Sequence, residues 1–436
     1  MIKAKGIQVC PIRNDDIRKH GAANDALIIR RLCPLSRNVR TVTSKNYSIE
    51  PVRTAAFTTA ARLSSRKNHS FVDALGARSF LLRRMDSGRK LKIIVDAMGG
   101  DFAPANEVAG TVQALRETHS AFEAILVGKE GEVQEQLTKH SVAGLPITVV
   151  NADEVITMED SPTAAVKQKK DSSLAAGMRL HLEGKADAFV SAGNTGAVLS
   201  ASTLILGRVK GVGRPTIGAF FPSEQGVCLL VDAGTNVDCR AQHLYEFAVM
   251  GSIYVQEILK IGNPTVGLLN VGEEKKKGTE IVQEAHRLLE ASKLNFVGNV
   301  EGRDILKGKV NVVVCDGFVG NVLLKFGESV PSFLKNRLKR YASGRVFRTL
   351  MVALMRGPLR TSLKDMDYEE HGGVPVLGVN GVTIIGHGSS SPKAIKNMIL
   401  KAVEVAKSQI NKRIEEALAQ TPHPAPLQGG AIRVTA

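Results

Sequence analysis

The chain has 436 residues, 43% of them hydrophobic, so it is long enough for a large buried core and for two or three domains. No uninterrupted apolar run of about 18 residues occurs, which argues against a membrane-spanning helix. Aromatic residues make up only 4% of the chain, and the five cysteines show no CxxC spacing. The composition therefore argues against a base-stacking nucleic-acid surface and a structural zinc site, and it fits a reducing compartment.

The net charge of +16 is concentrated at the N-terminus. Residues 1–84 contain 17 Lys and Arg against 5 Asp and Glu, a net charge of +12, which leaves +4 for residues 85–436. A targeting segment has this composition, and so does upstream sequence translated from an early start codon. We favour the second interpretation, because Met85 closely precedes a first strand. We expect residues 1–87 to be a basic leader, disordered or outside the native start, and residues 88–420 to form the folded domain.

Alternating signals for strands and helices begin at residue 92. The run 92–97 predicts a first strand, and 104–117 predicts a helix with an apolar face and with Glu107 near the positive end of its dipole. Further strands are predicted at 124–128, 147–150, 188–193, 218–222, 227–234, 265–272, 295–300, 310–317 and 382–388. These runs are nearly continuous in Val, Ile and Leu, so both faces of their sheet should be buried. The expected fold class is α/β, with helices on both sides of a mainly parallel sheet.

Residues 326–371 interrupt this alternation. Two stretches with apolar helical faces are separated by a Ser-Gly pair, which predicts a helical hairpin. Residues 335–364 contain nine Lys and Arg and no Asp or Glu, so the hairpin is a candidate docking surface for an acidic partner. After it, residues 392–419 predict one long last helix, and residues 421–436 predict a disordered tail.

Loops of Gly, Asn and Asp follow five of the apolar runs and lead into helix-like stretches, at 93–101, 189–197, 229–236, 267–274 and 312–321. Such loops lie at the carboxyl ends of parallel strands, where open α/β sheets bind ligands. Gly lets the backbone approach a ligand closely, and the N–H groups of a helix N-terminus suit anions. No loop matches GxGxxG or GxxxxGK[ST], and a single Gly-rich turn is more often plain punctuation between a strand and a helix. The five together predict a cleft suited to phosphate.

Eight motifs resemble, in order and spacing, the bacterial phosphate acyltransferase of phospholipid synthesis, the PlsX type. They are DAMGGD (96–101), KKDSS (169–173), SAGNTGA (191–197), DAGTN (232–236), NVGEEKKKG (270–278), GNVEGRD (298–304), DGFVGN (316–321) and GHGSS (386–390). The resemblance covers about residues 90–415. The leader has no counterpart in the family pattern, and Thr235 stands where the family usually has Ala. The resemblance implies a three-layer, Rossmann-like fold related to phosphotransacetylase and isopropylmalate dehydrogenase, with 326–371 as an inserted, protruding basic hairpin.

The resemblance also implies an activity. A long-chain acyl group moves from the thioester of acyl carrier protein to inorganic phosphate, and the acyl phosphate feeds phospholipid synthesis. A homodimer is implied, in the cytoplasm and peripherally associated with the inner membrane, with no cofactor, metal or nucleic acid. No covalent enzyme intermediate is expected, because phosphate is itself a nucleophile and the chain shows no GxSxG or Cys–His signature.

Such a site must aim phosphate at a thioester carbonyl and hold donors ready for the oxyanion that forms. For phosphate binding we predict Gly99, Gly100, Asp101, Lys169, Ser172, Ser173 and Thr195. For catalysis we predict Lys170, Asn194, Asp232, Asn236, Asp316, Asn321 and His387. The alternative for the Lys and Ser residues is a solvated basic helix start, and the alternative for the Asn residues is turn and cap formation.

Carboxylates end three of the predicted strands, at Asp96, Asp232 and Asp316. There they could orient a Lys or accept a proton, and a magnesium site is the weaker alternative. His387 is a candidate proton donor to the leaving thiolate, or else a loop-packing residue. Lys277 and Glu274 could be catalytic, although a charge run of this kind is usually a solvated face.

The hairpin has three predicted contacts. Basic residues should steer the acidic carrier protein or an anionic bilayer, namely Lys335, Arg337, Lys339 and Arg340. Apolar residues at an exposed tip should meet lipid or the acyl chain, namely Phe347, Leu350, Met351 and Leu354. Leu334, Leu338 and Tyr341 should form a subunit contact, and the alternative is that the dimer buries the whole apolar stripe.

Other functions stay open at this point. One is a phosphotransacetylase acting on acyl-CoA, and another is a nicotinamide dehydrogenase on the same sheet, although the first loop lacks the GxGxxG fingerprint. From a different class comes a non-catalytic peripheral membrane adaptor, in which the hairpin carries the function and the loops are scaffold.

Overall fold

The computed structural model describes residues 89–344, 346–362 and 372–420. The predicted leader (1–87) and tail (421–436) lie outside the described residues.

The core is one sheet of eleven strands in the order β3-β2-β1-β4-β11-β10-β5-β6-β9-β7-β8. The strands are β1 (Leu91–Asp96), β2 (Phe122–Gly128), β3 (Ile147–Asn151), β4 (Ala188–Ser191), β5 (Thr216–Ser223), β6 (Gly226–Val231), β7 (Thr265–Leu269), β8 (Asn295–Val300), β9 (Val312–Val314), β10 (Val374–Leu377) and β11 (Thr383–Ile385). Pairing is parallel from β3 to β11 and from β6 to β8, and antiparallel at β11–β10, β10–β5 and β5–β6. The predicted mainly parallel α/β sheet is confirmed.

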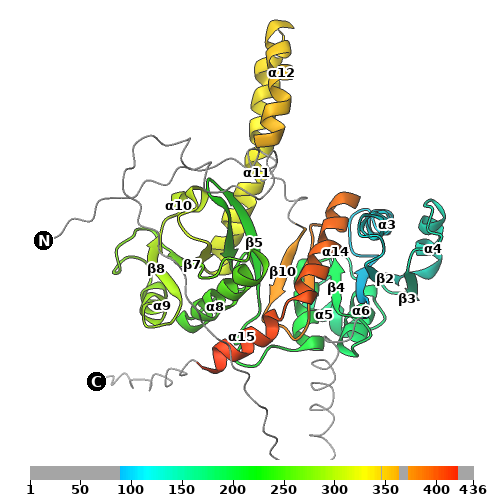
Figure 1. Cartoon of the computed structure of the whole chain (residues 1–436), viewed down its shortest axis with the longest axis horizontal. Helices are drawn as coiled ribbons and strands as arrows, with labels where there is room; N and C mark the ends of the chain where they lie inside the picture. The colour runs from blue at the N-terminus through cyan, green and yellow to red at the C-terminus, as the bar shows by residue number, and fades with distance from the viewer. Residues whose placement is uncertain (1–88, 345, 363–371, 421–436) are drawn as a thin grey trace, which may run out of the picture. The chain divides into compact units, whose positions relative to one another are not determined.

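Strand β10 joins the two halves of the sheet, and the sequence prediction missed it. In Figure 1 it lies between β5 on one side and β4 on the other. It pairs with β5 only through Val376 with Ile217 and Leu377 with Thr216. Beyond these positions β5 pairs with β6 alone. The two halves therefore separate beyond this short contact, next to the carboxyl ends of β4 and β11.

Helices cover both faces of the sheet and make three layers. They are α3 (Ala105–Glu117), α4 (Glu130–Thr138), α5 (Pro162–Gln168), α6 (Ser173–Leu182), α7 (Thr195–Ala201), the π-helix η2 (Ser202–Leu206), α8 (Ala241–Ile258), α9 (Glu280–Glu290), α10 (Gly302–Lys307), α11 (Gly317–Ala342), α12 (Val346–Ser362), α14 (Pro392–Lys407) and α15 (Ile410–Ala419). Side chains of β1 alternate: Ile93 and Val95 belong to the core on the face of α3 and α14, and Ile94 belongs to the core on the face of α6. The predicted three-layer arrangement is confirmed.

The last helix differs from the prediction of a single element at 392–419. It is two helices, because Ser408 takes an extended conformation and its hydroxyl donates to the carbonyl of Val405 at 2.6 Å. The break turns α15 so that Ile410, Ile414 and Leu418 are buried in the main core next to α8.

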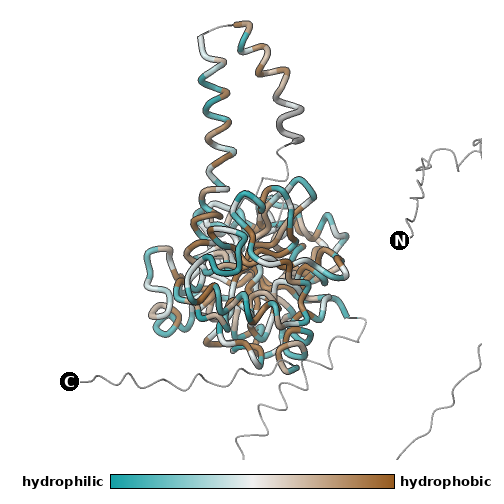
Figure 2. The backbone as a smooth tube through the Cα atoms, turned by 90° about the vertical axis from the view of Figure 1, so that its left-hand side faces the viewer, coloured by the Kyte–Doolittle hydropathy of each residue, from teal (hydrophilic) through white to brown (hydrophobic). Residues whose placement is uncertain are grey.

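The predicted hairpin consists of α12 and the later turns of α11, which stand away from the rest of the described chain (Figure 2). Its first helix begins at Gly317, shortly after β9, rather than at residue 326. Between the two helices, Arg348 lies over the Tyr341 ring at 4.8 Å, and the Thr349 hydroxyl donates to the carbonyl of Ala342 at 2.9 Å. Within the described part of the chain, no helix combines the length and hydropathy needed to cross a bilayer.

Three cysteines of the described chain, Cys228, Cys239 and Cys315, are buried and free. Burial raises the pKa of the Cys228 and Cys239 thiols to about 12 and also raises the pKa of Cys315 well above its usual value. The acidic side chains Asp232 and Asp316 raise the pKa values of Cys239 and Cys315 further. These thiols are therefore protonated near neutral pH.

Candidate active site

The loops after β1 and β4 meet over a buried carboxyl group. Asp96 ends β1 and is 2% exposed, and the Ser191 hydroxyl at the end of β4 donates to its Oδ2 at 2.7 Å. Ser191 in turn accepts from the Gly193 amide at 3.0 Å. A β-carbon on Gly99 would lie 2.4 Å from the Asp96 carboxylate, so only glycine fits there. Burial raises the pKa of Asp96, against the opposing effect of its hydrogen bonds.

The loop after β11 joins the same group. The amide of Asp101 donates to the carbonyl of Gly388 at 2.8 Å, which ties the DAMGGD loop to GHGSS. His387, beside it, is exposed, and its Nδ1 lies 2.7 Å from the Ser389 hydroxyl. Three strands from the first half of the sheet therefore end at one place, as the sequence pattern predicts for carboxyl ends of neighbouring parallel strands.

A second carboxyl group is buried beneath the DAMGGD loop. Glu107, in the first turn of α3, is 1% exposed, and its Oε2 has no hydrogen-bond partner within the described structure. Its Oε1 would lie 2.5 Å from a β-carbon on Gly100. Burial, together with the charges of Asp96 and Asp101, raises the pKa of Glu107 to about 8. The sequence pattern did not single out this side chain as a site residue.

Asp232 organises the loop after β6 from its centre. Its carboxylate accepts hydrogen bonds from the amides of Gly234, Thr235 and Asn236 at 3.0, 3.0 and 2.7 Å, and from the Thr235 hydroxyl at 2.6 Å. The Asn236 side chain donates to it at 2.8 Å and to the carbonyl of Pro215 at 2.9 Å. Asp232 is fully buried. Asp232 and Asn236 therefore fix the conformation of the loop after β6 in this structure.

The start of α11 packs against that loop. Asp316 caps the helix by accepting from the Val319 amide at 2.9 Å. Gly320 leaves no room for a side chain, because its β-carbon would fall 1.8 Å from the carbonyl oxygen of Asp232. One residue on, Asn321 lies against Gly234, whose β-carbon would be 3.2 Å from the Asn321 Oδ1. The helix thereby brings Asn321 to the loop after β6.

The segment 154–160 is held against α5, α6 and α7 by predicted site residues. Lys169 donates to Asp160 at 2.6 Å and to the carbonyl of Val155 at 2.9 Å, and this hydrogen bond lowers the pKa of Asp160. Asn194 caps α7 and donates to the carbonyls of Thr157, Met158 and Asp160. Ser172 caps α6 and, like Ser173, is buried, whereas Lys170 is exposed.

A cleft of about 800 Å³ opens where the two halves of the sheet separate. One end is formed by the polar loops, with Asp101, Gly193, Thr195, Gly234, Asn321, His387, Gly388 and Ser390. The other end is an apolar arm along β5, α10 and α11, with Ala219, Phe221, Ile305, Leu323, Leu324, Phe326 and Val330. The cleft therefore offers backbone and side-chain donors at one end and an apolar trough at the other.

Nine of the predicted site residues fall into two groups, and the other five, Gly99, Gly100, Lys170, Ser172 and Ser173, are not among the residues that line the cleft. Asp101, Thr195, Asn321 and His387 line the cleft. Asn194, Asp232, Asn236, Asp316 and Lys169 shape the loops around it through hydrogen bonds within the protein. Lys277 and Glu274 are not among the residues that line it. In the described part of the chain, no group of three or more His, Cys, Asp or Glu is placed to hold a metal ion.

Several residues of the cleft were not predicted individually. Gly193, Gly234 and Ser390 line the cleft and belong to three of the sequence motifs, so the motifs carry the signal for them. The apolar arm could not have been found this way, because Phe221 and Leu324 look like ordinary core residues of a strand and a helix.

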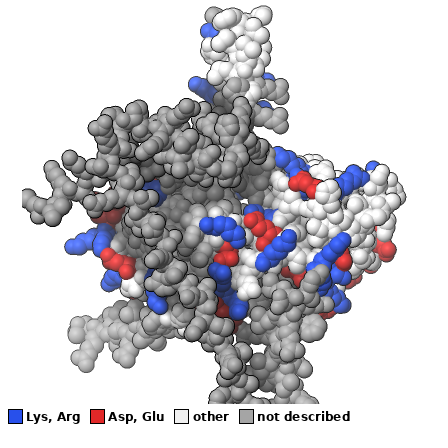
Figure 3. Space-filling model, viewed as in Figure 1, with Lys and Arg blue, Asp and Glu red and all other residues white. Residues whose placement is uncertain are grey.

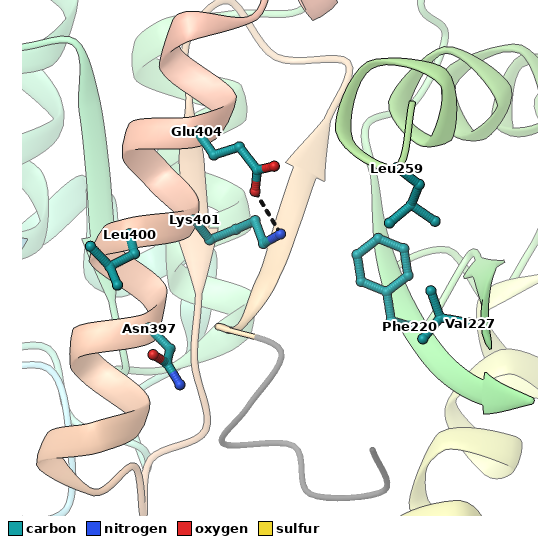
Figure 4. A pocket seen from close by; sticks show the side chains of 7 residues that line it. All are labelled: Phe220, Val227, Leu259, Asn397, Leu400, Lys401 and Glu404. Atoms are coloured by element: carbon teal, nitrogen blue, oxygen red, sulfur yellow. Dashed lines mark hydrogen bonds and ion pairs between the residues drawn. The ribbon is translucent and has the colours of Figure 1, made fainter. Parts of the chain in front are cut away.

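A second, smaller cavity of about 280 Å³ lies between α14 and the β5–β6 hairpin (Figure 4). Phe220, Val227 and Leu259 form one side, and Asn397, Leu400, Lys401 and Glu404 of α14 form the other. Lys401 pairs with Glu404 at 2.8 Å and lies 5.9 Å from the centre of the Phe220 ring. Phe220 lines both cavities.

The amino-acid sequence of this chain is similar to those of known proteins. The family model described as fatty acid synthesis protein matches residues 91–413. A phosphate acyltransferase of Chlorobaculum parvum is 49% identical over 338 residues, covering 75% of this chain and 99% of the relative. A phosphate acyltransferase of Acetivibrio thermocellus is 47% identical over 325 residues, covering 74% and 95%.

Among solved structures, a phosphotransacetylase from Streptococcus pyogenes matches with a TM-score of 0.50 and 19% identity, covering 77% of this chain and 99% of that one. This likeness shows a shared fold. The family match, together with relatives of nearly half identical sequence along almost their whole length, shows more: this chain belongs to the fatty acid synthesis protein family, the family of the phosphate acyltransferases.

Proposed function

We propose that this protein transfers a long-chain acyl group from the thioester of acyl carrier protein to inorganic phosphate, giving acyl phosphate for phospholipid synthesis. The observation that carries the proposal is a single cleft that joins a polar end made of glycine loops to an apolar arm. Phosphate needs backbone donors at helix starts, and an acyl chain needs apolar walls. The name of the relatives, phosphate acyltransferase, supports the same reaction.

The reaction is a direct displacement at the thioester carbonyl. A phosphate oxygen attacks the carbonyl carbon, the new C–O bond forms, the C–S bond breaks, and the thiolate leaves and takes up a proton. Donors that are already in place stabilise the oxyanion, and Asn321 and the backbone at Thr195 lie in the cleft for this role. His387, at the same end, is our candidate for protonating the thiolate.

The remaining predicted residues act on the loops. Asp232, Asn236 and Asp316 hold the loop after β6 against the start of α11, and Asn194 and Lys169 fix the segment 154–160. Gly99 packs against Asp96 and Gly100 against Glu107, so neither position has room for a side chain, and Ser172 and Ser173 are also buried. Lys170 is exposed and is not among the residues that line the cleft, and we expect it to balance phosphate charge from outside. These roles are predictions.

The test measures thiol release from palmitoyl carrier protein with and without inorganic phosphate. Release that depends on phosphate is expected, and Asn321→Ala should lower kcat by about 10- to 1000-fold through loss of an oxyanion donor. Asn263→Ala, at an exposed position outside the cleft, is the matched control and should retain activity. Palmitoyl-CoA as donor separates the two enzyme hypotheses: a phosphotransacetylase would use it at least as well. Thiol release that ignores phosphate would refute the proposal.

The hairpin is proposed to dock the protein on acidic partners. Lys335, Arg337, Lys339 and Arg340 are all exposed along α11. Figure 3 shows the described end of the hairpin as largely uncharged, with basic but no acidic residues in view. Val346 and Phe347 at its turn are 89% and 73% exposed. We expect the basic residues to attract carrier protein and anionic lipid, and Phe347, Leu350, Met351 and Leu354 to enter the bilayer surface.

Co-sedimentation with anionic liposomes tests the docking. Leu350→Glu with Met351→Glu should abolish liposome binding and leave thiol release in solution intact. Val271→Glu is the control, because Val271 is 81% exposed on a different part of the molecule. Equal binding by all three proteins would contradict membrane docking. An Asn321→Ala protein that had lost all measurable thiol release and still performed its role in cells would favour the adaptor hypothesis instead.

A homodimer and a peripheral location at the cytoplasmic face of the inner membrane complete the proposal. Leu334 and Tyr341 are 39% and 56% exposed in a single chain, and Phe333 beside them is 62% exposed. A subunit contact would bury this apolar surface. Sedimentation should give the mass of a dimer, and Leu334→Glu should shift it towards a monomer. A monomeric wild-type protein would rule this contact out.

A further inference from the structure

The carboxyl group of Glu107 is placed unusually for a side chain with no assigned role. It is 1% exposed, its Oε1 lies against Gly100, and its Oε2 has no partner within the described structure. Gly100 and Asp101 belong to the loop that we propose binds phosphate, and Asp101 lines the cleft. A buried carboxyl group therefore lies directly against the loop that we propose binds phosphate.

Two other carboxylates act on Glu107. Asp96 at the end of β1 and Asp101 in the loop both favour its neutral form, as burial does, and the pKa of Glu107 is about 8. Three charged groups on the other elements packed against α3 are paired with surface residues. Lys396 of α14 pairs with Glu117 at 2.6 Å, Glu123 of β2 pairs with Lys92 at 3.1 Å, and Glu132 of α4 pairs with Lys129 at 3.0 Å.

We propose that Glu107 is a positioning residue that sets the charge beneath the DAMGGD loop: neutral, it allows the loop to hold an anion, and ionised, it weakens anion binding. Ionisation would add a negative charge behind backbone donors that face phosphate, and like charges in a region of low dielectric repel strongly. This inference rests on the proposed function only in taking phosphate as the anion. It predicts a loss of anion affinity on the alkaline side.

The experiment must separate titration of the protein from titration of phosphate. Sulfate serves as the probe, because it keeps two negative charges over the whole range from pH 6.5 to 9.5, whereas phosphate does not. Sulfate inhibition constants against phosphate, and the rise in Tm on adding sulfate, would be measured on the full chain. The proteins are wild type, Glu107→Gln and the control Glu117→Gln, which removes an exposed carboxylate at the far end of the same helix.

We expect the sulfate affinity of wild type to fall by about tenfold between pH 7 and 9.5, since one buried like charge near the anion is only partly screened. Glu107→Gln should lose less than about twofold, because it stays neutral throughout. Glu117→Gln should behave like wild type. A parallel fall in all three proteins, or no fall in wild type, would overturn the inference.

The two proposals fail in different ways. Absence of phosphate-dependent thiol release at every pH would sink the proposed function, while the sulfate-dependent Tm would still report on Glu107. If Glu107→Gln does not fold, the wild-type series decides: a sulfate affinity that stays constant through pH 8 contradicts the role of Glu107.

Discussion

Two glycines allow the loops of the cleft to pack closely, because a β-carbon at either position would collide with a neighbouring oxygen. Gly99 sits where a β-carbon would approach the Asp96 carboxylate to 2.4 Å, and Gly320 sits where one would fall 1.8 Å from a carbonyl oxygen. Neither glycine has a left-handed backbone, so close approach rather than conformational freedom explains both. The sequence showed that these glycines lie in loops, but it could not show which atoms they approach.

Gly99→Ala should therefore damage catalysis. The added methyl group would push Asp96 or the loop out of place, and a shift of about 1 Å at a reactive site costs on the order of 100-fold in rate. Gly131→Ala, in helix α4 with no atom within 4 Å of its β-carbon, is the control and should leave kcat/KM unchanged. Full activity of Gly99→Ala would show that the loop tolerates the shift.

Glu107 should also make stability depend on pH. Its pKa of about 8 lies above the usual value of 4.5, so the folded state holds a proton that the unfolded state has released. The stability from this group is complete below pH 4.5 and is lost as the pH rises towards 8. Between pH 5 and 7 the free energy of unfolding of wild type should fall by about 2–3 kcal/mol relative to Glu107→Gln, measured by urea unfolding. Parallel curves would contradict the raised pKa.

At the scale of elements, α11 serves both the site and the surface. Its first turns bring Asn321 and Leu324 to the cleft, and its last turns carry the exposed basic residues. The pattern of charges and apolar faces predicted the hairpin but not its start at Gly317, because the Gly-rich segment after β9 looks like a loop. Likewise the Val-Pro-Val-Leu run of β10 is too short and contains a Pro that argues against a strand.

We expect the apolar arm to give α11 a role in choosing the acyl chain. Gly327 lines it, and a β-carbon there would lie 2.9 Å from the Phe221 ring. Gly327→Leu should fill the arm, so activity with a 16-carbon donor should fall by about tenfold more than with an 8-carbon donor, since each lost CH₂ contact is worth about 0.8 kcal/mol. Gly357→Leu, in α12 with open space around its β-carbon, is the control. Equal losses with both donors would show that the chain lies elsewhere.

At the scale of the whole molecule, the three layers could be predicted from the sequence, but the division of the sheet into two halves could not. Runs of Val, Ile and Leu predicted ten strands, all of which are present, because burial on both faces leaves a direct trace in composition. The antiparallel junction at β10 and β5 depends on pairing between residues 159 or more positions apart, Ile217 with Val376, which leaves no local trace. The cleft forms at that junction. The motifs therefore predicted several of the loops that line the cleft, and the tertiary structure alone revealed Glu107 and the apolar arm.

Burial of the free thiols of Cys228, Cys239 and Cys315 affects whether the protein can take up the acyl group itself. A thioester exchanges readily with any accessible thiolate, so a protein that binds thioesters can be acylated on its own cysteines. Thiols that are protonated and buried in the core are poor nucleophiles and cannot reach the thioester carbonyl. Incubation with an acyl thioester in the absence of phosphate should therefore leave these three side chains unmodified by mass spectrometry, and the acyl group should stay on the donor until phosphate is added.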